Sequence, residues 1–442
     1  MQSLLARRPR SWTATIATGL VAALVGCGGG GDGMTPMPDA APDAAPPPTP
    51  TALTIRTYAD GPPFTGAPSS PPLVAFQDGD GAWTSLSGTS GVYQVTAQQA
   101  RYAIAIGCSA DRATLALYYR APADGADIQL VGCPPAVAQV HLSVALSNLA
   151  AGETAVVAIG HAVVGLFSAP DMLTLTADIP RAAADAFVVV VGGPDSARAV
   201  QRVARLGRLP LDKDQTLTFD AGAAAPAPEV HAAMVVGAET QEVVTRSSRY
   251  ATAGARFNVT LSQLAPADSY LTVPAAARQP GDLISASVAG ERTLADMNVY
   301  TRFAQQTVAT PTDVVLELPP RFLAAPPMRG DVASPRTTFV LLATKDLLPF
   351  SAYAVALATA PASGAGQSVA MTVTSAWMGA APLAPMAVPD LSALPGWSPS
   401  MALLRDRPLT WSITRQNRST PLDGPEAEGT LYTSAIAGVV NP

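Results

Sequence analysis

The sequence predicts an all-β protein, with tandem β-sandwich modules behind a disordered Pro/Ala-rich tether. Charged residues make up only 14% of the 442 residues, whereas Pro and Gly are frequent, at 42 and 35 residues. Short apolar runs rich in β-branched and aromatic residues recur about every ten residues, with turn residues between them. This combination is typical of sandwiches and barrels rather than of helical bundles.

The amino terminus has the parts of an export signal. Three arginines within residues 7–10 precede an apolar run over residues 12–25. A run of about 14 residues is too short for the roughly 20 that a membrane-spanning helix needs, and it fits the core of a signal peptide. Residues 1–26 are therefore predicted to be a removable leader.

The end of this leader, Leu24-Val25-Gly26-Cys27, resembles the lipobox of bacterial lipoprotein precursors. The resemblance covers only the leader. It implies cleavage between Gly26 and Cys27, diacylglycerol on the Cys27 sulfur and an acyl chain on its nitrogen, and thus a membrane anchor in the cell envelope. Gly28, in place of Asp, favours the outer membrane, on its periplasmic or cell-surface face. An ordinary secretion signal with a chance cysteine is the alternative.

Residues 27–50 are predicted to be a disordered linker that follows the lipidated cysteine. Four glycines are followed by a stretch of mostly Pro, Ala and Asp. This composition cannot bury a core, and proline favours an extended spacer of roughly 3 Å per residue. The linker is expected to hold the folded modules away from the membrane.

Residues 51–137 are predicted to be the first module, a sandwich with a disulfide. Residues 54–58 and 102–106 show the period-two alternation of strands. Together with the strand that leads to Cys133, short strands span a length that is the size of one immunoglobulin-like or related β-sandwich. The acids of Asp78-Gly79-Asp80-Gly81 are assigned to a hairpin turn, because the further ligands of a calcium loop are missing.

Cys108 and Cys133 are predicted to bond to each other, because an exported protein reaches an oxidising compartment. Each cysteine follows a glycine at the end of an apolar run, which places both near strand ends. Closing a loop of about 25 residues would stabilise the module by roughly 3 kcal/mol. Two free thiols are the alternative.

Residues 138–228 and 229–333 are predicted to be the second and third β modules. Val140-His141 and Val230-His231 open them 90 residues apart, which suggests a duplicated unit. Residues 154–169 are apolar, but they are short, β-branched and interrupted by glycine. Two packed strands, or a strand and a turn, are therefore predicted there rather than a membrane span.

Helices are expected at two places only, both in the second module. An Asp-Ser cap signal opens residues 195–206, and residues 179–186 are a weaker candidate. If the first segment is helical, its arginines fall near one face and form a basic stripe, which is more typical of a solvated surface than of a polymer-binding one. These arginines are Arg198, Arg202, Arg205 and Arg208.

Residues 334–442 are predicted to be the C-terminal β module, and they contain the candidate ligand contact. Trp397 lies in the loop sequence Pro395-Gly396-Trp397-Ser398-Pro399. A ring in such a loop can face solvent and stack on a sugar. The other tryptophans of the mature chain belong to strand patterns and are predicted to be core; they are Trp83, Trp377 and Trp411.

The sequence contains no local pattern of enzyme chemistry. It has no Gly-x-Ser-x-Gly elbow and no phosphate-binding glycine loop. Its three histidines, His141, His161 and His231, are widely separated and lack the spacing of metal ligands. No catalytic residue, metal site or cofactor is therefore predicted.

The charge balance argues against nucleic acid as a partner. The chain has 33 acidic and 27 basic residues, and the leader removes three basic residues and no acidic ones, which leaves a net charge of about −9. Nucleic-acid surfaces need clustered positive charge. The partners expected instead are the membrane, through the N-terminal lipid, and an envelope protein or a polysaccharide.

These patterns together predict a lipid-anchored protein of the cell envelope with a binding or structural role. The composition resembles that of envelope lipoproteins of high-GC bacteria, a likeness that carries no catalytic residues with it. The alternative is a carboxylate-based hydrolase acting on extracellular or cell-wall polymers, since two acids brought together by folding leave no local motif. A third class, a partner in an envelope assembly, would expose a large apolar patch.

Overall fold

The computed structural model describes residues 49–441, apart from 60–67, 109–112, 134–137, 161, 171–172, 182, 193–198, 223–226, 254–257, 261–267, 323, 330–335, 343–345, 360–365, 382 and 423–426. The predicted leader, Gly26, Cys27 and almost all of the tether lie outside the described residues. Residues 48–442 form one compact unit. Within the described ranges, no helix has the length and apolar character needed to cross a membrane.

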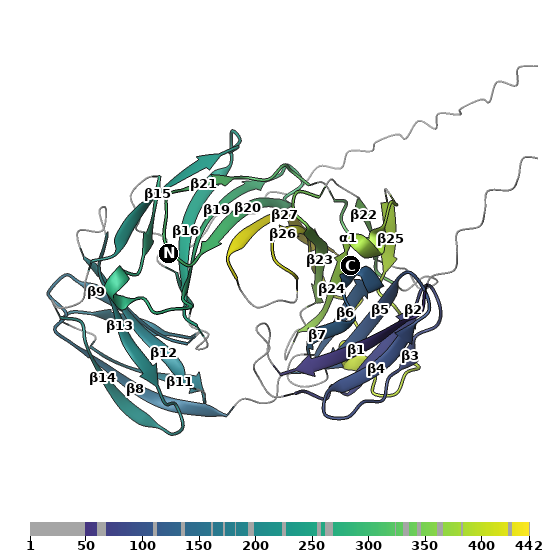
Figure 1. Ribbon diagram of the computed structural model, residues 1–442, viewed down its shortest axis with the longest axis horizontal. Coiled ribbons are helices and arrows are strands. Elements are labelled where there is room, and N and C mark those ends of the chain that lie inside the picture. The colour runs from purple at the N-terminus through teal and green to yellow at the C-terminus, as the bar shows by residue number, and fades with distance from the viewer. Residues whose placement is uncertain are drawn as a thin grey trace, which may run out of the picture. The chain divides into compact units, whose positions relative to one another are not determined.

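The fold is nearly all β, which confirms the predicted fold class. Its strands fall into four successive sets (Figure 1). The first set is β1 (Thr51–Tyr58), β2 (Leu73–Asp78), β3 (Thr84–Ser85), β4 (Val92–Ala97), β5 (Tyr102–Cys108), β6 (Ala113–Arg120) and β7 (Asp127–Val131). The second set is β8 (Gln139–Ser147), β9 (Thr154–Ile159), β10 (Ala162–Ser168), β11 (Thr174–Pro180), β12 (Ala184–Gly192), β13 (Ala199–Leu209) and β14 (Gln215–Asp220).

The third and fourth sets follow in the same manner. The third set is β15 (Glu229–Val236), β16 (Val243–Ala251), β17 (Asn258–Thr260), β18 (Ser269–Thr272), β19 (Leu283–Thr293), β20 (Val299–Val308) and β21 (Val314–Glu317). The fourth set is β22 (Thr338–Leu342), β23 (Phe350–Thr359), β24 (Gln367–Thr374), β25 (Leu383–Ala387), β26 (Leu409–Arg418) and β27 (Gly429–Val440). The helices are short: α1 (Ser375–Met378), η1 (Pro122–Asp124), η4 (Ala275–Ala277) and η5 (Pro399–Met401).

One strand order recurs in these sets. In the first three, the first strand pairs antiparallel with the fourth and parallel with the seventh, giving the sheets β4-β1-β7, β11-β8-β14 and β18-β15-β21. The remaining strands of each set form a second sheet, in which the third, second, fifth and sixth strands of the set lie side by side in that order. This order gives β3-β2-β5-β6, β10-β9-β12-β13 and β17-β16-β19-β20, and the fourth set repeats it as β24-β23-β26-β27. Val140-His141 and Val230-His231 occupy the same positions of β8 and β15. The sequence similarity that suggested a duplication therefore coincides with a repeat in strand order.

Three of these second sheets join into one sheet of twelve strands (Figure 1). The sixth strands of the third and fourth sets, β20 and β27, pair antiparallel, and β24 of the fourth set pairs parallel with β6 of the first. Each set lies within one of the four predicted modules, whose exact limits stay predictions. The hydrogen bonding of the long sheet, however, continues from one set to the next.

The strands that the first set contributes to the twelve-stranded sheet are covered on both faces. Alternate residues of a strand point to opposite faces. On β5, Ile104 and Ile106 belong to the core of the first set, whereas Ala103 and Ala105 belong to a core shared with the fourth set. The second face is therefore covered by residues of the fourth set. This arrangement positions the pocket described below.

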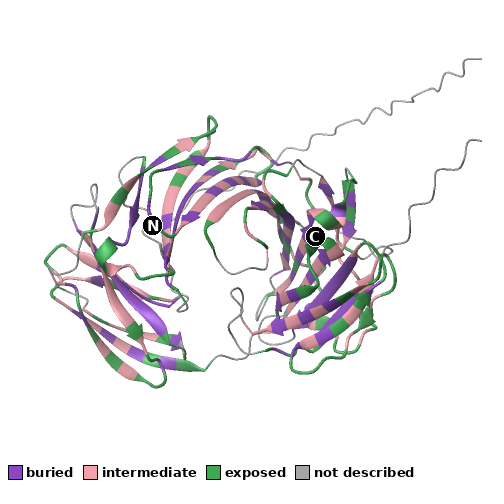
Figure 2. Cartoon of the chain, viewed as in Figure 1, coloured by how far each residue is buried: buried purple, intermediate pink, exposed green. Residues whose placement is uncertain are grey.

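Both helix predictions for the second set are wrong. Residues 199–206 belong to the strand β13, residues 179–180 end β11, and residues 184–186 begin β12. β13 pairs along β12, which is buried over almost its whole length (Figure 2). Pairing with a buried strand satisfies the backbone and buries the valines of β13, and this tertiary gain overrides a weak local helix preference. The predicted pair of strands within residues 154–169 is confirmed as the hairpin of β9 and β10.

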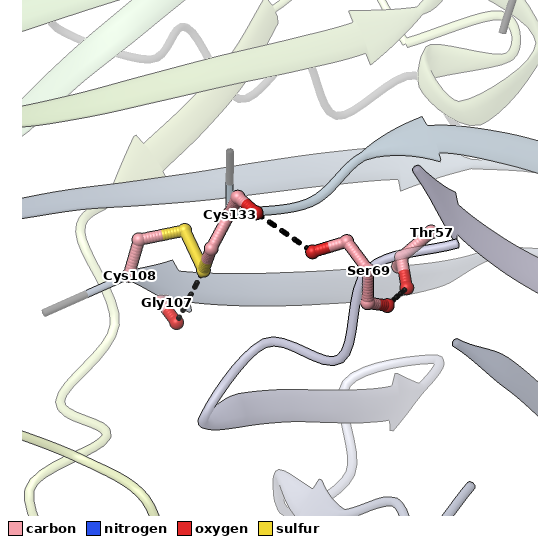
Figure 3. The surroundings of a disulfide bond; sticks show 5 residues. All are labelled: Thr57, Ser69, Gly107, Cys108 and Cys133. Carbon is pink, nitrogen blue, oxygen red and sulfur yellow. Dashed lines mark hydrogen bonds between the residues drawn. A yellow bond between two sulfur atoms is a disulfide. The ribbon is translucent and has the colours of Figure 1, made fainter. Parts of the chain in front are cut away.

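The predicted disulfide between Cys108 and Cys133 is present (Figure 3). Cys108 ends β5 in the long sheet, and Cys133 follows β7 in the sheet β4-β1-β7, so the bond joins the two layers of the first set. The Ser69 hydroxyl donates to the Cys133 carbonyl at 2.8 Å, and the Thr57 hydroxyl donates to the Ser69 carbonyl at 2.5 Å. The end of β7 is therefore held by both a covalent bond and a chain of hydrogen bonds.

Candidate binding pocket around Trp397

Trp397 lies in the long connection between β25 and β26, as its Pro- and Gly-rich surroundings predict. The connection turns at residues 394–397, where the Trp397 N–H donates to the Leu394 carbonyl at 3.2 Å. Gly396 has a φ of 83°, and a Cβ atom there would be 1.8 Å from the Pro72 carbonyl oxygen. Glycine is therefore needed at this position both for the positive φ and for the close approach to Pro72. Because it has no side chain, the loop can lie against the first set.

The next residues of the connection continue this contact. η5 brings Met401, which is 1% exposed, against β5. A Cβ atom on Gly107 would be 2.6 Å from the Met401 sulfur. Gly107 immediately precedes the disulfide cysteine Cys108. The loop that carries Trp397 is thus seated on a strand that the disulfide fixes.

A pocket of about 200 Å³ opens beside Trp397. It lies between the start of β22, the segment that follows β25, and the residues around η5. Trp397 is half-buried and packs partly on the shared core, and its remaining surface lines the pocket. The other lining residues are Arg329, Arg336, Thr337, Val388, Pro389, Asp390, Met401, Ala402, Leu403 and Arg405.

Three of the lining residues are arginines, and they differ in their partners. The Arg329 guanidinium donates to the carbonyl oxygens of Leu404 and Arg407, and it thereby braces the segment between them. Arg336 and Arg405 are exposed, and neither forms an ion pair with any residue in the described part of the chain. Both guanidinium groups are therefore accessible from solvent at the pocket.

Asp390 is the one carboxylate among the lining residues. Hydrogen bonds from Ser392 hold the pKa of Asp390 below its ordinary value, and the nearby charge of Arg336 lowers it further. Asp390 is therefore ionised at neutral pH. The described residues of the pocket then carry three positive charges and one negative charge, on a chain whose net charge is −6.

This arrangement suits a small ring that carries acceptor groups. The indole of Trp397 offers a flat apolar face, and Met401 and Leu403 add apolar wall. Guanidinium groups bind carboxylate, sulfate or phosphate through paired N–H donors. The volume is below the roughly 300 Å³ at which sites for drug-sized ligands begin, so the pocket suits a single sugar ring.

The other tryptophans have structural positions. Trp411 of β26 is 3% exposed, which agrees with its assignment to the core. Trp377 lies on α1 and not on a strand, so that part of the prediction is wrong. Its ring makes an edge contact with Tyr119 at 5.3 Å, and the Arg101 guanidinium lies 4.9 Å from its centre. Trp83 precedes β3 and is half-buried.

The predicted basic stripe of the second set is also wrong, because the segment is a strand and two of its arginines are paired. Arg202 binds Glu153, and Arg205 binds both Asp185 and Asp282 at 2.8 Å. Arg198 lies outside the described residues. The paired arginines link strands and sets rather than forming a surface for a polymer.

Asp185 and Asp282 are a pair of carboxylates brought together by folding, as a hydrolase needs. Their side chains are only 5% and 3% exposed, however, and one guanidinium, that of Arg205, binds both. The Tyr250 hydroxyl also donates to Asp282. A carboxylate pair that is buried and neutralised in this way cannot reach a polymer, and it acts as an ionic link between the second and third sets.

The histidines and the acidic turn have ordinary partners. His141 contacts Asp178 at 2.8 Å, and His231 lies 3.5 Å from Glu229; His161 lies outside the described residues. The turn at Asp78–Gly81 closes through a backbone hydrogen bond of 3.0 Å, as its assignment to a hairpin turn requires. Within the described ranges, no group of three or more His, Cys, Asp or Glu residues could hold a metal ion.

Of the residues singled out in the sequence, Cys108 and Cys133 come together, and Trp397 lines a pocket. Sequence reasoning missed the three arginines, because they are spread over 76 residues and share no local pattern. Gly26 and Cys27 precede the described residues. The chain matches no protein-family model, and comparison with curated protein sequences finds no match.

Proposed function

We propose that this protein is a lipid-anchored protein of the cell envelope that binds a saccharide of an envelope or extracellular polymer. The leader and its lipobox-like end support the anchor, most simply in the outer membrane. The pocket at Trp397 is the single observation that carries the binding role. Its aromatic wall can stack on the apolar face of a sugar ring, and its guanidinium groups can bind the polar substituents of that ring.

Binding is better supported than hydrolysis. Glycoside hydrolysis uses two carboxyl groups about 5–9.5 Å apart on either side of the bond that breaks. Among the described residues, Asp390 is the single carboxylate that lines this pocket, and Asp185 and Asp282 are buried against Arg205. The carboxylate-based hydrolase is therefore not proposed for this site.

The binding role is tested by measuring saccharide binding of the full chain in detergent against an array of bacterial glycans. Trp397→Ala removes the indole and is expected to weaken binding about tenfold or more, because the ring supplies the stacking surface. Trp83→Ala, a tryptophan away from the pocket, is the matched control and is expected to bind normally. Binding that survives Trp397→Ala in a folded chain, or the absence of any bound glycan, would contradict the proposed site.

The anchor is tested by cell fractionation of the native chain beside Cys27→Ala, with mass spectrometry of the amino-terminal peptide. The native chain is expected at the membrane with lipid on Cys27, and the variant is expected in the soluble fraction. An unmodified terminus with unchanged fractionation would refute the anchor. That result would leave the pocket to be judged by its own experiment.

A further inference from the structure

We infer that the sugar bound at Trp397 carries a negatively charged group, and that Arg336 and Arg405 bind this group. This inference rests on the proposed function and adds the ligand's chemical class. The two arginines come from different segments, one just before β22 and one just after η5, and they meet at one pocket. The charged group is a carboxylate, sulfate or phosphate on the sugar ring.

The donor and acceptor balance of the pocket points to an anion. A guanidinium group has five N–H donors and no acceptor, so Arg336 and Arg405 make the lining rich in donors, whereas the terminal nitrogens of Arg329 already donate to backbone carbonyls. Neutral sugars carry hydroxyl groups that must both donate and accept. Among the described residues that line the pocket, Asp390 and Thr337 offer side-chain acceptors. A ligand rich in acceptors, such as an acidic sugar, matches this lining better than a neutral one.

A ligand that covers Arg336 and Arg405 would place them in surroundings like those of the shielded arginines elsewhere in the chain. Where Arg202, Arg205 and Arg302 are shielded from water, each is bound by at least one carboxylate. Arg336 and Arg405 are exposed and line one pocket, and neither forms an ion pair within the described residues, although Arg336 lies near enough to Asp390 to lower its pKa. An anionic ligand would supply the carboxylate, sulfate or phosphate that the chain supplies in the other cases.

Arg329 has a different part in this site. Its two terminal nitrogens donate to the carbonyl oxygens of Leu404 and Arg407, on either side of Arg405. It therefore fixes the backbone that presents Arg405 and is a positioning residue. Asp390 carries the opposing charge and offers an acceptor for sugar hydroxyls.

The test compares two oligosaccharides that differ only in charge, one with glucuronate and one with glucose at the same place. Calorimetry on the full chain is expected to show about tenfold tighter binding of the glucuronate form, and added salt is expected to weaken it. The double variant Arg336→Gln/Arg405→Gln is expected to lose this preference, so that the glucuronate form binds no more tightly than the glucose form. Arg292→Gln, on β19 outside the pocket, is the matched control and is expected to keep both.

Sulfated and phosphorylated forms of the same oligosaccharide separate the sources of the charge, and the tightest one identifies the anionic group. Equal binding of charged and neutral forms, or a preference that survives the double variant, would overturn the inference. If the inference fails in this way but the neutral form still binds and its binding still requires Trp397, the proposed function is retained. Absence of binding by every form in the native chain would overturn both.

Discussion

Glu153 binds both terminal nitrogens of Arg202, at 2.8 and 2.6 Å, and so ties the start of β9 to β13. The third set repeats this pair, since Glu242 before β16 binds Arg302 of β20 through two nitrogens. Each glutamate also accepts a hydrogen bond of 2.9 Å from the backbone N–H three residues earlier. An equivalent ion pair therefore links the residue before the second strand to the sixth strand in two successive sets.

Loss of this ion pair is expected to destabilise the fold. Glu153→Gln leaves the Arg202 charge without its carboxylate at a site that is largely shielded from water, which costs about 2 kcal/mol. Denaturant unfolding of the full chain measures the change. Glu291→Gln, at an exposed position of β19, is the control and should change stability little. Equal stability of the two variants would show that the ion pair adds nothing.

The same ion pair predicts a pH dependence. Hydrogen bonding from Arg202 lowers the pKa of Glu153 below its ordinary value of 4.5, against an opposing effect of burial. Because the folded-state pKa is the lower one, the contribution to stability is complete above about pH 4.5 and is lost as the pH falls through the folded-state pKa. The difference in unfolding free energy between the native chain and Glu153→Gln should therefore shrink in acid. A difference that stays constant would contradict this assignment.

The Cys108–Cys133 bond is expected to stabilise the first set. Removing it frees a loop of 25 residues in the unfolded chain, a loss of roughly 3 kcal/mol. Cys108→Ser, Cys133→Ser and the double variant should lower the unfolding free energy equally, since one bond is lost in all three. Alkylation of both thiols in the unreduced native chain would instead show that they are free.

Gly396 offers a test of how the Trp397 loop is held. Gly396→Ala places a Cβ atom against the Pro72 carbonyl, at a φ of 83°. Gly152→Ala is a close match, because Gly152 has a φ of 82° with nothing within 4 Å of its Cβ position. Both variants carry backbone strain, but only the first is expected to displace the loop and to weaken saccharide binding. Equal binding by the two variants would show that the contact with Pro72 does not position Trp397.

Local pattern was enough to predict much of the fold. The alternation of residues 54–58 gave β1, and the glycines before Cys108 and Cys133 placed both cysteines at strand ends. The Pro-Gly-Trp sequence placed Trp397 in a loop. These features depend on side-chain periodicity and turn chemistry within a few residues, which a single sequence shows directly.

Features that depend on distant pairing could not be predicted. Nothing local shows that β24 pairs with β6, more than two hundred residues earlier, or that β20 pairs with β27. Residues 199–206 carried a helix-like pattern, and only the buried partner β12 makes them a strand. The arginines of the pocket likewise meet through tertiary structure alone, so Trp397 could be predicted from local sequence and its charged neighbours could not.

The crystal structure of the full chain with a glucuronate-containing oligosaccharide tests most directly whether Trp397 and its arginines bind an acidic sugar. The sugar ring is expected on the indole of Trp397, with its carboxylate at Arg336 and Arg405. A saccharide bound at another surface, or an empty pocket at saturating oligosaccharide, would contradict the proposed site.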